Sequence, residues 1–248
     1  LLDYRFVSLN AYDDQETAIR IFKDHDRVAL PVTDSDGVLL GIVTFDDIMD
    51  VEEEETTEDF HKFGSFQNAI INPLKARASF MYQKRILWLT VLVFMNIFSG
   101  VTISSFEHVI QSMVSLMFFL PLLIGSGGNA GSQSATLMIR SLAVGDVEMK
   151  DWLRLVGKEF IVSFLLGVTM AVGVSLIASF RSPEIIIVVA STMILTVMAG
   201  SLIGLTVPFI FTKLNIDPAT ASAPLITSIA DIMGVWIYFS LAARIFGL

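Results

Sequence analysis

Long runs of apolar residues dominate the C-terminal two thirds of the chain. Four of these runs have about twenty residues or more, at residues 86–106, 160–180, 185–211 and 218–246. A helix of that length crosses the hydrocarbon core of a bilayer. A fifth run starts near Met113, stops at Ile124 and resumes from Ala135 to Ala143. The pattern predicts a mainly α-helical membrane protein with five transmembrane helices, the second of them broken.

The interruption of the second run, Gly125–Ser134, consists of small and polar residues. Irregular backbone at membrane depth survives only where protein buries it or water lines it. Small residues also let two helices pack closely. Both interpretations stay open, because helices could approach here while Asn129 and backbone carbonyls face a pore. No Gly-Lys-Ser/Thr follows, which disfavours a phosphate loop, and Gly200 and Gly204 in the fourth span predict a packing motif.

The apolar segments in the first 60 residues are shorter. The predicted order is helix, strand, turn, strand and helix, at residues 14–25, 28–33, 34–37, 38–44 and from 45 onward. Thr44 is a suitable N-cap for the second helix. The turn reads Asp-Ser-Asp-Gly, which has hairpin chemistry and lacks the later acidic ligands of an EF-hand calcium loop. The head is therefore expected to be a small α/β unit.

Charge divides the chain at the same place. The net charge is −9, the hydrophobic fraction is 54% and the mean hydropathy is +0.69. Residues 1–60 hold 17 Asp/Glu and 4 Lys/Arg, and the remainder holds 8 and 12. This acidic head favours cations and disfavours nucleic acid as partners. The sequence has no cysteine, which excludes disulfides and thiolate metal sites. It opens Leu1-Leu2-Asp3 without an initiator methionine or basic leader, as expected for the C-terminal part of a longer protein.

An acidic connector follows the head. Nine carboxylates fall within the fourteen residues from Asp46 to Asp59. On a helix they repel one another at i,i+4, which suits a solvated linker. Mg²⁺ and Ca²⁺ take oxygen ligands and would relieve that repulsion, which suits a cation sensor. The residues alone favour the two interpretations about equally, and the position beside a predicted cation path favours the sensor. Phe60 to Ile71 continues amphipathically up to Pro73.

Asp231 is the only charged residue between Pro218 and Ala243. A carboxylate at membrane depth is costly and commonly marks an ion or proton path. Small and polar residues recur around it every three or four positions and form one helix face: Thr220, Pro224, Thr227, Ser228, Gly234 and Tyr238. Asp217 lies four turns earlier, ~21 Å away on one continuous helix. Asp217 could instead be a plain N-cap, and Asp231 a buried acid hydrogen-bonded between helices.

Basic residues indicate the orientation in the membrane. They cluster before the first span and in the loop at 140–158, and Lys213 follows the fourth span. Only Arg181 and Arg244 fall on the other side. The positive-inside rule then places the head in the cytosol and the C-terminus outside, provided that the second span crosses.

The head resembles a CBS domain through Val28–Val32, Asp36-Gly37 and Gly41–Asp47. In that family a Thr and the Asp three residues later often contact an adenosine ribose, and Thr44 and Asp47 occupy those positions. The resemblance therefore implies an adenine-nucleotide site, although such modules work in pairs and about one is present.

The membrane part resembles the MgtE family of Mg²⁺ channels. The resemblance is carried by Pro121–Thr136, by Asp217–Asp231, and by the order of CBS unit, acidic helix and five spans. It implies three regions: a partial cytosolic CBS domain at 1–52, an acidic connecting or plug helix at 53–82, and a pore domain at 83–248.

The same resemblance implies a homodimer in a cell inner membrane, with a pore on the two-fold axis lined by the second and fifth spans. Asp231 would select the ion. The implied pore residues that complete the path are Asp217, Asn129, Gly125 and Gly128. Mg²⁺ dehydrates reluctantly, so a site that holds it with its waters is physically sensible.

Regulation by cytosolic Mg²⁺ is also implied by the resemblance. Ions bridging the head and the plug helix would close the pore, and their loss would let the acids repel and open it. The implied sensor acids are Asp14, Glu16, Asp26, Asp47, Asp50, Glu55, Glu58 and Asp59. The family's N-terminal helical domain and first CBS repeat match nothing in these 248 residues. Ser132 and Ala223 stand where some relatives carry Asn.

Other functions fit parts of the sequence. A transporter for another divalent cation, or one coupled to Na⁺ or H⁺, would use the same residues. An intramembrane enzyme using Asp217 and Asp231 as a pair is disfavoured by their predicted separation. A membrane-anchored CBS nucleotide sensor would not need Asp231 or the interrupted second span. We therefore expect a transporter or channel and not an enzyme.

Overall fold

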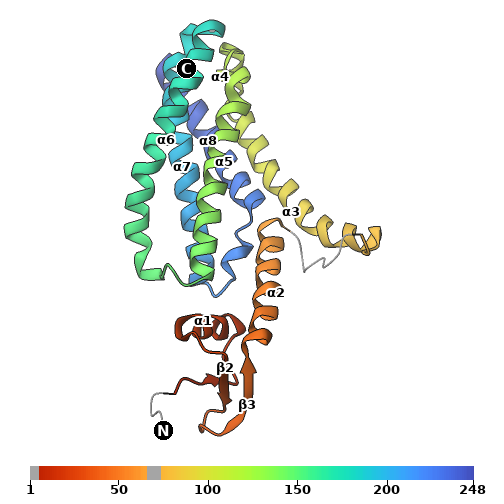
Figure 1. Cartoon of the computed structure of the whole chain (residues 1–248). Coiled ribbons are helices and arrows are strands. Elements are labelled where there is room, and N and C mark those ends of the chain that lie inside the picture. The colour runs from red at the N-terminus through yellow and green to blue at the C-terminus, as the bar shows by residue number, and fades with distance from the viewer. Residues whose placement is uncertain (1–5, 66–73) are drawn as a thin grey trace.

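The computed structural model describes residues 6–65 and 74–248 and shows a small α/β head below a helical bundle (Figure 1). The head contains β1 (Leu9–Asn10), α1 (Gln15–His25), β2 (Ala29–Thr33) and β3 (Leu39–Thr44). The sheet order is β1-β2-β3, with β1 and β2 parallel and β2 and β3 antiparallel. Its core is formed by Leu9, Ile19, Phe22, Leu30 and Ile48. The predicted α/β order is confirmed.

The turn between β2 and β3 is the predicted hairpin turn. The Oδ1 atom of Asp34 accepts hydrogen bonds from the backbone N–H groups of Asp36 at 2.9 Å and Val38 at 2.8 Å. Gly37 has φ of +80°, which only glycine adopts without strain. The acidic side chain at this turn is thus occupied in closing the hairpin.

A single helix, α2 (Phe45–Phe63), leads from the head to the bundle. Its N-terminus is a capping box, in which the backbone N–H and the hydroxyl of Thr44 both donate to Asp47 Oδ2, at 3.1 and 2.6 Å. The acidic connector is therefore helical as far as Phe63. Of the rest of the predicted plug helix, which was expected to reach residue 82, residues 66–73 lie outside the described residues and residues 78–82 belong to the next helix, Ala78–Ser104.

The bundle consists of long helices joined by short turns. In chain order they are α3 (Ala78–Ser104), α4 (Glu107–Ser112), α5 (Leu116–Ala143), η1 (Met149–Asp151), α6 (Trp152–Arg181), η2 (Pro183–Ile185), α7 (Ile186–Lys213), η3 (Pro218–Thr220) and α8 (Ala223–Phe246). Within the described ranges, four helices are long and apolar enough to cross a membrane, namely α3, α6, α7 and α8. The helix α5 has 28 residues but is not among these four.

The predicted break in the second span is wrong, because α5 is continuous through Gly125–Ser134. The small residues serve close packing against α7. A Cβ atom on Gly131 would lie 2.8 Å from the carbonyl oxygen of Gly200, and one on Gly204 would collide with the carbonyl of Gly131. Glycine lowers helix propensity by only ~1 kcal/mol, so packing against a neighbouring helix outweighs it. The predicted packing role of Gly200 and Gly204 is confirmed.

The last span also differs from its prediction. Helix α8 begins at Ala223, and Asp217 caps the separate short turn η3, where its Oδ1 accepts from the N–H of Ala219 at 2.8 Å. Pro224 explains the later start, because it has no N–H to continue a helix from the preceding turn and belongs in a first helical turn. Asp217 and Asp231 therefore do not share one continuous helix, and the four-turn separation does not apply.

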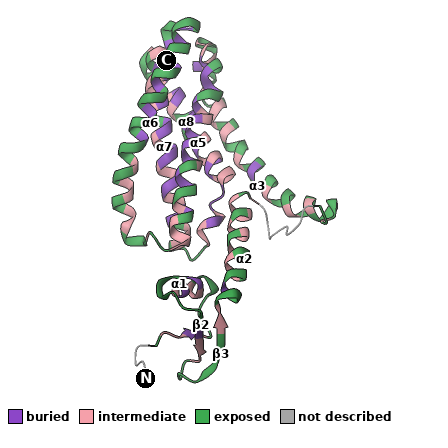
Figure 2. Cartoon of the chain, viewed as in Figure 1, coloured by how far each residue is buried: buried purple, intermediate pink, exposed green. Residues whose placement is uncertain are grey.

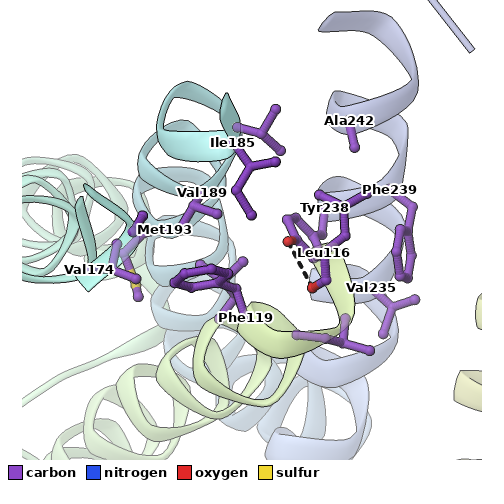
Figure 3. Close-up of a cluster of buried hydrophobic side chains, with 14 of the residues drawn as sticks. Leu116, Phe119, Val174, Ile185, Val189, Met193, Val235, Tyr238, Phe239 and Ala242 are labelled. Carbon is purple, nitrogen blue, oxygen red and sulfur yellow. Dashed lines mark hydrogen bonds between the residues drawn. The ribbon is translucent and has the colours of Figure 1, made fainter. Parts of the chain in front are cut away.

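The bundle core lies between α5, α7 and α8 (Figure 2). Figure 3 shows the part of this core where Tyr238 is fully buried and its hydroxyl donates to the carbonyl oxygen of Leu116 at 3.0 Å. Phe119, Met193 and Phe239 pack around this bond. By contrast, most apolar side chains of α3 and α6 are exposed, as expected for helices that face lipid.

Candidate functional site

Asp231 lies in the middle of α8 and faces α5. A Cβ atom on Gly128 would lie 3.3 Å from Asp231 Oδ1 and 2.8 Å from the Cγ2 of Thr227. The lack of a side chain at Gly128 therefore makes the space that the carboxylate occupies. Asp231 Oδ1 is buried and has no hydrogen-bond partner among the described residues. This disfavours the alternative of an acid hydrogen-bonded between helices and favours a bound cation or its waters as the partner.

A polar stripe runs along α5 beside this carboxylate. Asn129, Gln133 and Thr136 recur at intervals of four and three residues, and all three are exposed. Ser132 Oγ lies 3.2 Å from Thr227 Oγ1, which joins α5 to α8 one turn from Asp231. Polar groups exposed at membrane depth are costly in lipid. The stripe therefore needs water or another protein surface against it.

Asp217 caps η3, which packs against α2. Its Oδ2 atom accepts from Lys62 Nζ at 2.5 Å, and the same ammonium lies 2.7 Å from Glu58 Oε1. Burial opposes the charged form of Lys62, but the hydrogen bonds to Asp217 and Glu58 outweigh it and raise the pKa of Lys62 above its usual range. Asp217 is thus both a cap and one half of an ion pair between the connector and the bundle.

The sequence analysis missed Lys62. The signal was present, because Lys62 is the only Lys or Arg between Arg27 and Lys75 and follows the longest acidic run of the chain. Its partner Asp217 is 155 residues away, however, so no local pattern connects the two.

A cavity of about 680 Å³ lies between α1, α2, the loop after α5, and η3. Its acidic lining residues are Asp14, Glu16, Glu55, Glu58, Asp59, Glu148 and Asp217. Five of the eight predicted sensor acids are therefore brought together with one predicted pore residue. Arg20 and Lys62 line the same cavity.

The three other predicted sensor acids lie elsewhere. Asp47 is held in the capping box at the start of α2. Asp26 forms the left-handed C-cap of α1, with φ of 48°. Asp50 lines a separate, more open hollow along α2, together with Asp46 and Glu53 of the same helix.

Carboxylates in the cavity raise one another's pKa. Burial, and then repulsion by Asp59, Glu55, Asp14 and Asp217, raises the pKa of Glu16 to about 7. Burial followed by neighbouring carboxylates also raises the pKa of Glu55 and of Asp59. Within the described part of the chain, no three His, Asp or Glu side chains converge closely enough to ligate one ion directly. The cavity can therefore attract cations and bridge them between elements, but direct ligation would need side-chain movement.

The candidate nucleotide residues Thr44 and Asp47 are engaged with each other. Hydrogen bonds from the side chain and backbone of Thr44 lower the pKa of Asp47. They lie at the junction of β3 and α2, beside the exposed apolar side chains of Leu40 and Ile42. The geometry satisfies the helix N-terminus without a ligand, so the plain capping role accounts for both side chains.

Comparison with known proteins agrees with the two-part architecture. Residues 120–241 match the family model MgtE, described as a divalent cation transporter, and residues 2–54 match the CBS domain model. The chain belongs to the MgtE family. This family consists of transporters and not enzymes, and its membership together with the apolar helices makes the chain a multi-pass membrane protein.

Three relatives each bear the name magnesium transporter MgtE. Those of Thermus thermophilus and Bacillus subtilis are each 37% identical, over 243 and 244 residues, which is 98% of this chain and 54% of each relative. That of Enterococcus faecalis is 33% identical over 247 residues, which is 98% of this chain and 53% of the relative. The chain thus spans about half the length of the curated relatives it matches.

Proposed function

We propose that this chain forms the pore and the adjoining regulatory part of a Mg²⁺-selective channel or transporter. In this proposal residues 1–52 are a partial CBS domain, 53–82 a connecting plug helix, and 83–248 a pore domain of five spans. The family membership supports this assignment, and so do the names of the relatives. The single observation that carries it is the buried, unpartnered oxygen of Asp231 against the bare backbone of Gly128.

The second of the five proposed spans is α5, which is not among the four helices identified by length and apolar composition. With 28 residues it would be ~42 Å long, which exceeds the ~30 Å of a bilayer core. It lies among the apolar helices and contacts α7 closely along its glycine face. With five crossings, the start of α3 and the end of α8 lie on opposite sides of the membrane. Figure 1 shows the C-terminus far from the head. Together with the basic residues on the head side, this supports a cytosolic head and an outer C-terminus.

The functional unit of the proposal is a homodimer. One chain leaves the polar stripe of Asn129, Gln133 and Thr136 uncovered at membrane depth. A second copy related by a two-fold axis would present the same stripe and a second Asp231, and so enclose a polar path. Two carboxylates facing each other would hold Mg²⁺ through its tightly bound waters. Asn129 and the backbone at Gly125 and Gly128 would line the rest of this path, with Asp217 at its cytosolic mouth.

Regulation in this proposal occurs at the acidic cavity. At high cytosolic Mg²⁺, ions in the cavity would offset the repulsion between α1, α2 and η3 and hold the head against the bundle. At low Mg²⁺, the repulsion that raises the pKa of Glu16 would favour separation. The proposed acids are those that line the cavity, while Asp26 and Asp47 are left with local structural roles and Asp50 lies outside the cavity. Nucleotide binding at Thr44 and Asp47 forms no part of the proposal.

Mg²⁺ flux into liposomes tests the path. We expect Asp231→Asn to lower the flux by roughly tenfold or more, because it removes a full charge from a desolvated passage. Glu184→Gln is the matched control, since it removes one charge from an exposed position in η2. Equal flux in wild type and Asp231→Asn would make Asp231 structural. Faster flux of Mn²⁺ or Co²⁺ than of Mg²⁺ would favour the second candidate, a transporter for another divalent cation.

A further inference from the structure

The segment Asp217–Ser222, which leads into α8, is held from two sides. Lys62 on α2 pairs with Asp217 at its beginning. The indole N–H of Trp88 on α3 donates to Ser222 Oγ at its end, at 3.3 Å. Asp231 follows Ser222 by nine residues on the same helix, so a shift of this segment moves the carboxylate. Helices α2 and α3 therefore both contact the segment that precedes the helix carrying the candidate ion site.

Lys62 joins α2 to the bundle through a direct contact between side chains. Its ammonium binds one carboxylate of its own helix, Glu58, and one of the bundle, Asp217, and only 28% of its side-chain surface is exposed. A charge-assisted bond in a partly buried position is stronger than an exposed pair. Asp217 is itself fixed by the N–H of Ala219, so the bond joins α2 to a defined point of η3.

We propose that Lys62 is a positioning residue that fastens the connector helix α2 to the start of α8 without a metal ion. Its single positive charge offsets one of the two negative charges of Asp217 and Glu58, so that cytosolic cations have less negative charge to offset in the cavity. The effect is to lower the Mg²⁺ concentration at which the pore closes. This inference deepens the proposed function and rests on it.

Lys62 could instead compete with Mg²⁺ for the carboxylates, and the half-closing Mg²⁺ concentration distinguishes the two roles. If Lys62 acted only as a competitor for the carboxylates, its removal would free Asp217 and Glu58 for Mg²⁺ and would lower the half-closing concentration. If Lys62 fastens the helix, its removal adds one more repulsion that Mg²⁺ must overcome and raises that concentration. The two roles thus predict shifts of opposite sign.

Mg²⁺-dependent closure in liposomes is the first test. We expect Lys62→Met to raise the half-closing Mg²⁺ concentration by about threefold to tenfold, as the loss of one charge-assisted hydrogen bond predicts. Lys62→Arg should restore most of the wild-type value. The control is Lys23→Met, which removes the same charge and breaks an exposed pair between α1 and Glu52 of α2. An unchanged or lowered half-closing concentration in Lys62→Met would overturn the proposal.

A distance measurement separates this inference from the proposed function. The chain has no cysteine, so spin labels can be placed at Glu54→Cys on α2 and Lys150→Cys before α6, both exposed positions. Without Mg²⁺, Lys62→Met should give a broader and longer distance distribution than wild type or Lys23→Met. A distribution identical to wild type would contradict the positioning role. Altered distances without Mg²⁺ flux in any variant would refute the transport function and keep the role of Lys62.

Discussion

The glycines of this bundle lie against two kinds of neighbour, backbone atoms and side-chain atoms. At Gly131, Gly200 and Gly204, an added Cβ would meet backbone carbonyl groups, which cannot move aside as side-chain ends do. At Gly128 it would meet side-chain atoms of Thr227 and Asp231. The first three glycines set the spacing between α5 and α7, and the last one makes room for the carboxylate. Only the last is expected to affect ion passage more than stability.

Gly204→Ala should destabilise the bundle because its methyl group overlaps the carbonyl of Gly131. The expected cost is ~1–3 kcal/mol, as for an overpacked core. Gly173→Ala on α6 is the matched control, since nothing lies within 4 Å of its added Cβ and alanine favours the helix. Unfolding in detergent micelles measures both. A Gly204→Ala protein as stable as the control would show that α5 and α7 separate more easily than the structure indicates.

Gly128→Ala tests whether Gly128 serves the packing of helices or the passage of ions. Its methyl group would press against the Cγ2 atom of Thr227 and the carboxylate of Asp231, both of which are side-chain atoms. We expect a smaller loss of stability than in Gly204→Ala together with a clear loss of Mg²⁺ flux. The paired measurement is flux beside unfolding for each variant. Flux that falls only in proportion to stability would assign Gly128 to packing alone.

At the scale of elements, the sequence predicted most helices and strands of the described ranges, and it failed where the deciding contact is distant. Alternating and helical apolar periods are local signals, and the hairpin turn of the head follows directly from its Asp and Gly residues. The continuity of α5 through its glycines depends on α7, seventy residues later. The start of α8 at Ala223 does have a local signal in Pro224, which belongs in a first helical turn.

The candidate site shows the same division. Asp231 could be found from its isolation in an apolar run, because the cost of a buried charge is a property of that run alone. The sequence shows the acids of α2 only as one dense series of carboxylates. It does not show which face of α2 meets the bundle. The structure places Glu55, Glu58 and Asp59 on that face and Asp50 on another.

The contact between the head and the bundle should depend on pH through Glu16. Its pKa is about 7 in the packed arrangement and 4.5 when free, so the packed state binds more protons between these values. Packing is therefore favoured at low pH and weakens as the pH rises through about 7. Asp14, Glu55, Asp59 and Asp217 face Glu16 with the same sign, and Arg20 and Lys62 also line the cavity.

The spin-label distance between α2 and the start of α6, without Mg²⁺, measures this dependence. It should lengthen from pH 6 to pH 8 in wild type and change less in Glu16→Gln, which cannot ionise. Glu53→Gln is the control because Glu53 lies on the other face of α2. A distance that is independent of pH in wild type would show that Glu16 is not held near its neighbours.

For the whole molecule, the acidic cavity predicts that Mg²⁺ binding and the stability of the folded chain are linked. A ligand that binds only the packed state stabilises it by ~2.7 kcal/mol at one hundred times its dissociation constant. We expect the unfolding temperature in detergent to rise with Mg²⁺, and the rise to shrink in the double variant Glu55→Gln/Asp59→Asn. That variant should be more stable than wild type without Mg²⁺, because it removes two mutually repelling carboxylates.

The matched control for this last prediction is Asp46→Asn/Asp50→Asn, which removes the same charge from the same helix on the face away from the cavity. If the cavity carries the effect, this control keeps the full Mg²⁺-dependent rise. If the two double variants lose the rise equally, the response comes from the overall acidity of the head, as screening of dispersed charges would produce. In that case ions would act as a diffuse atmosphere around α2, and the arrangement of Glu16, Asp59 and Asp217 would have no special part in closing the pore.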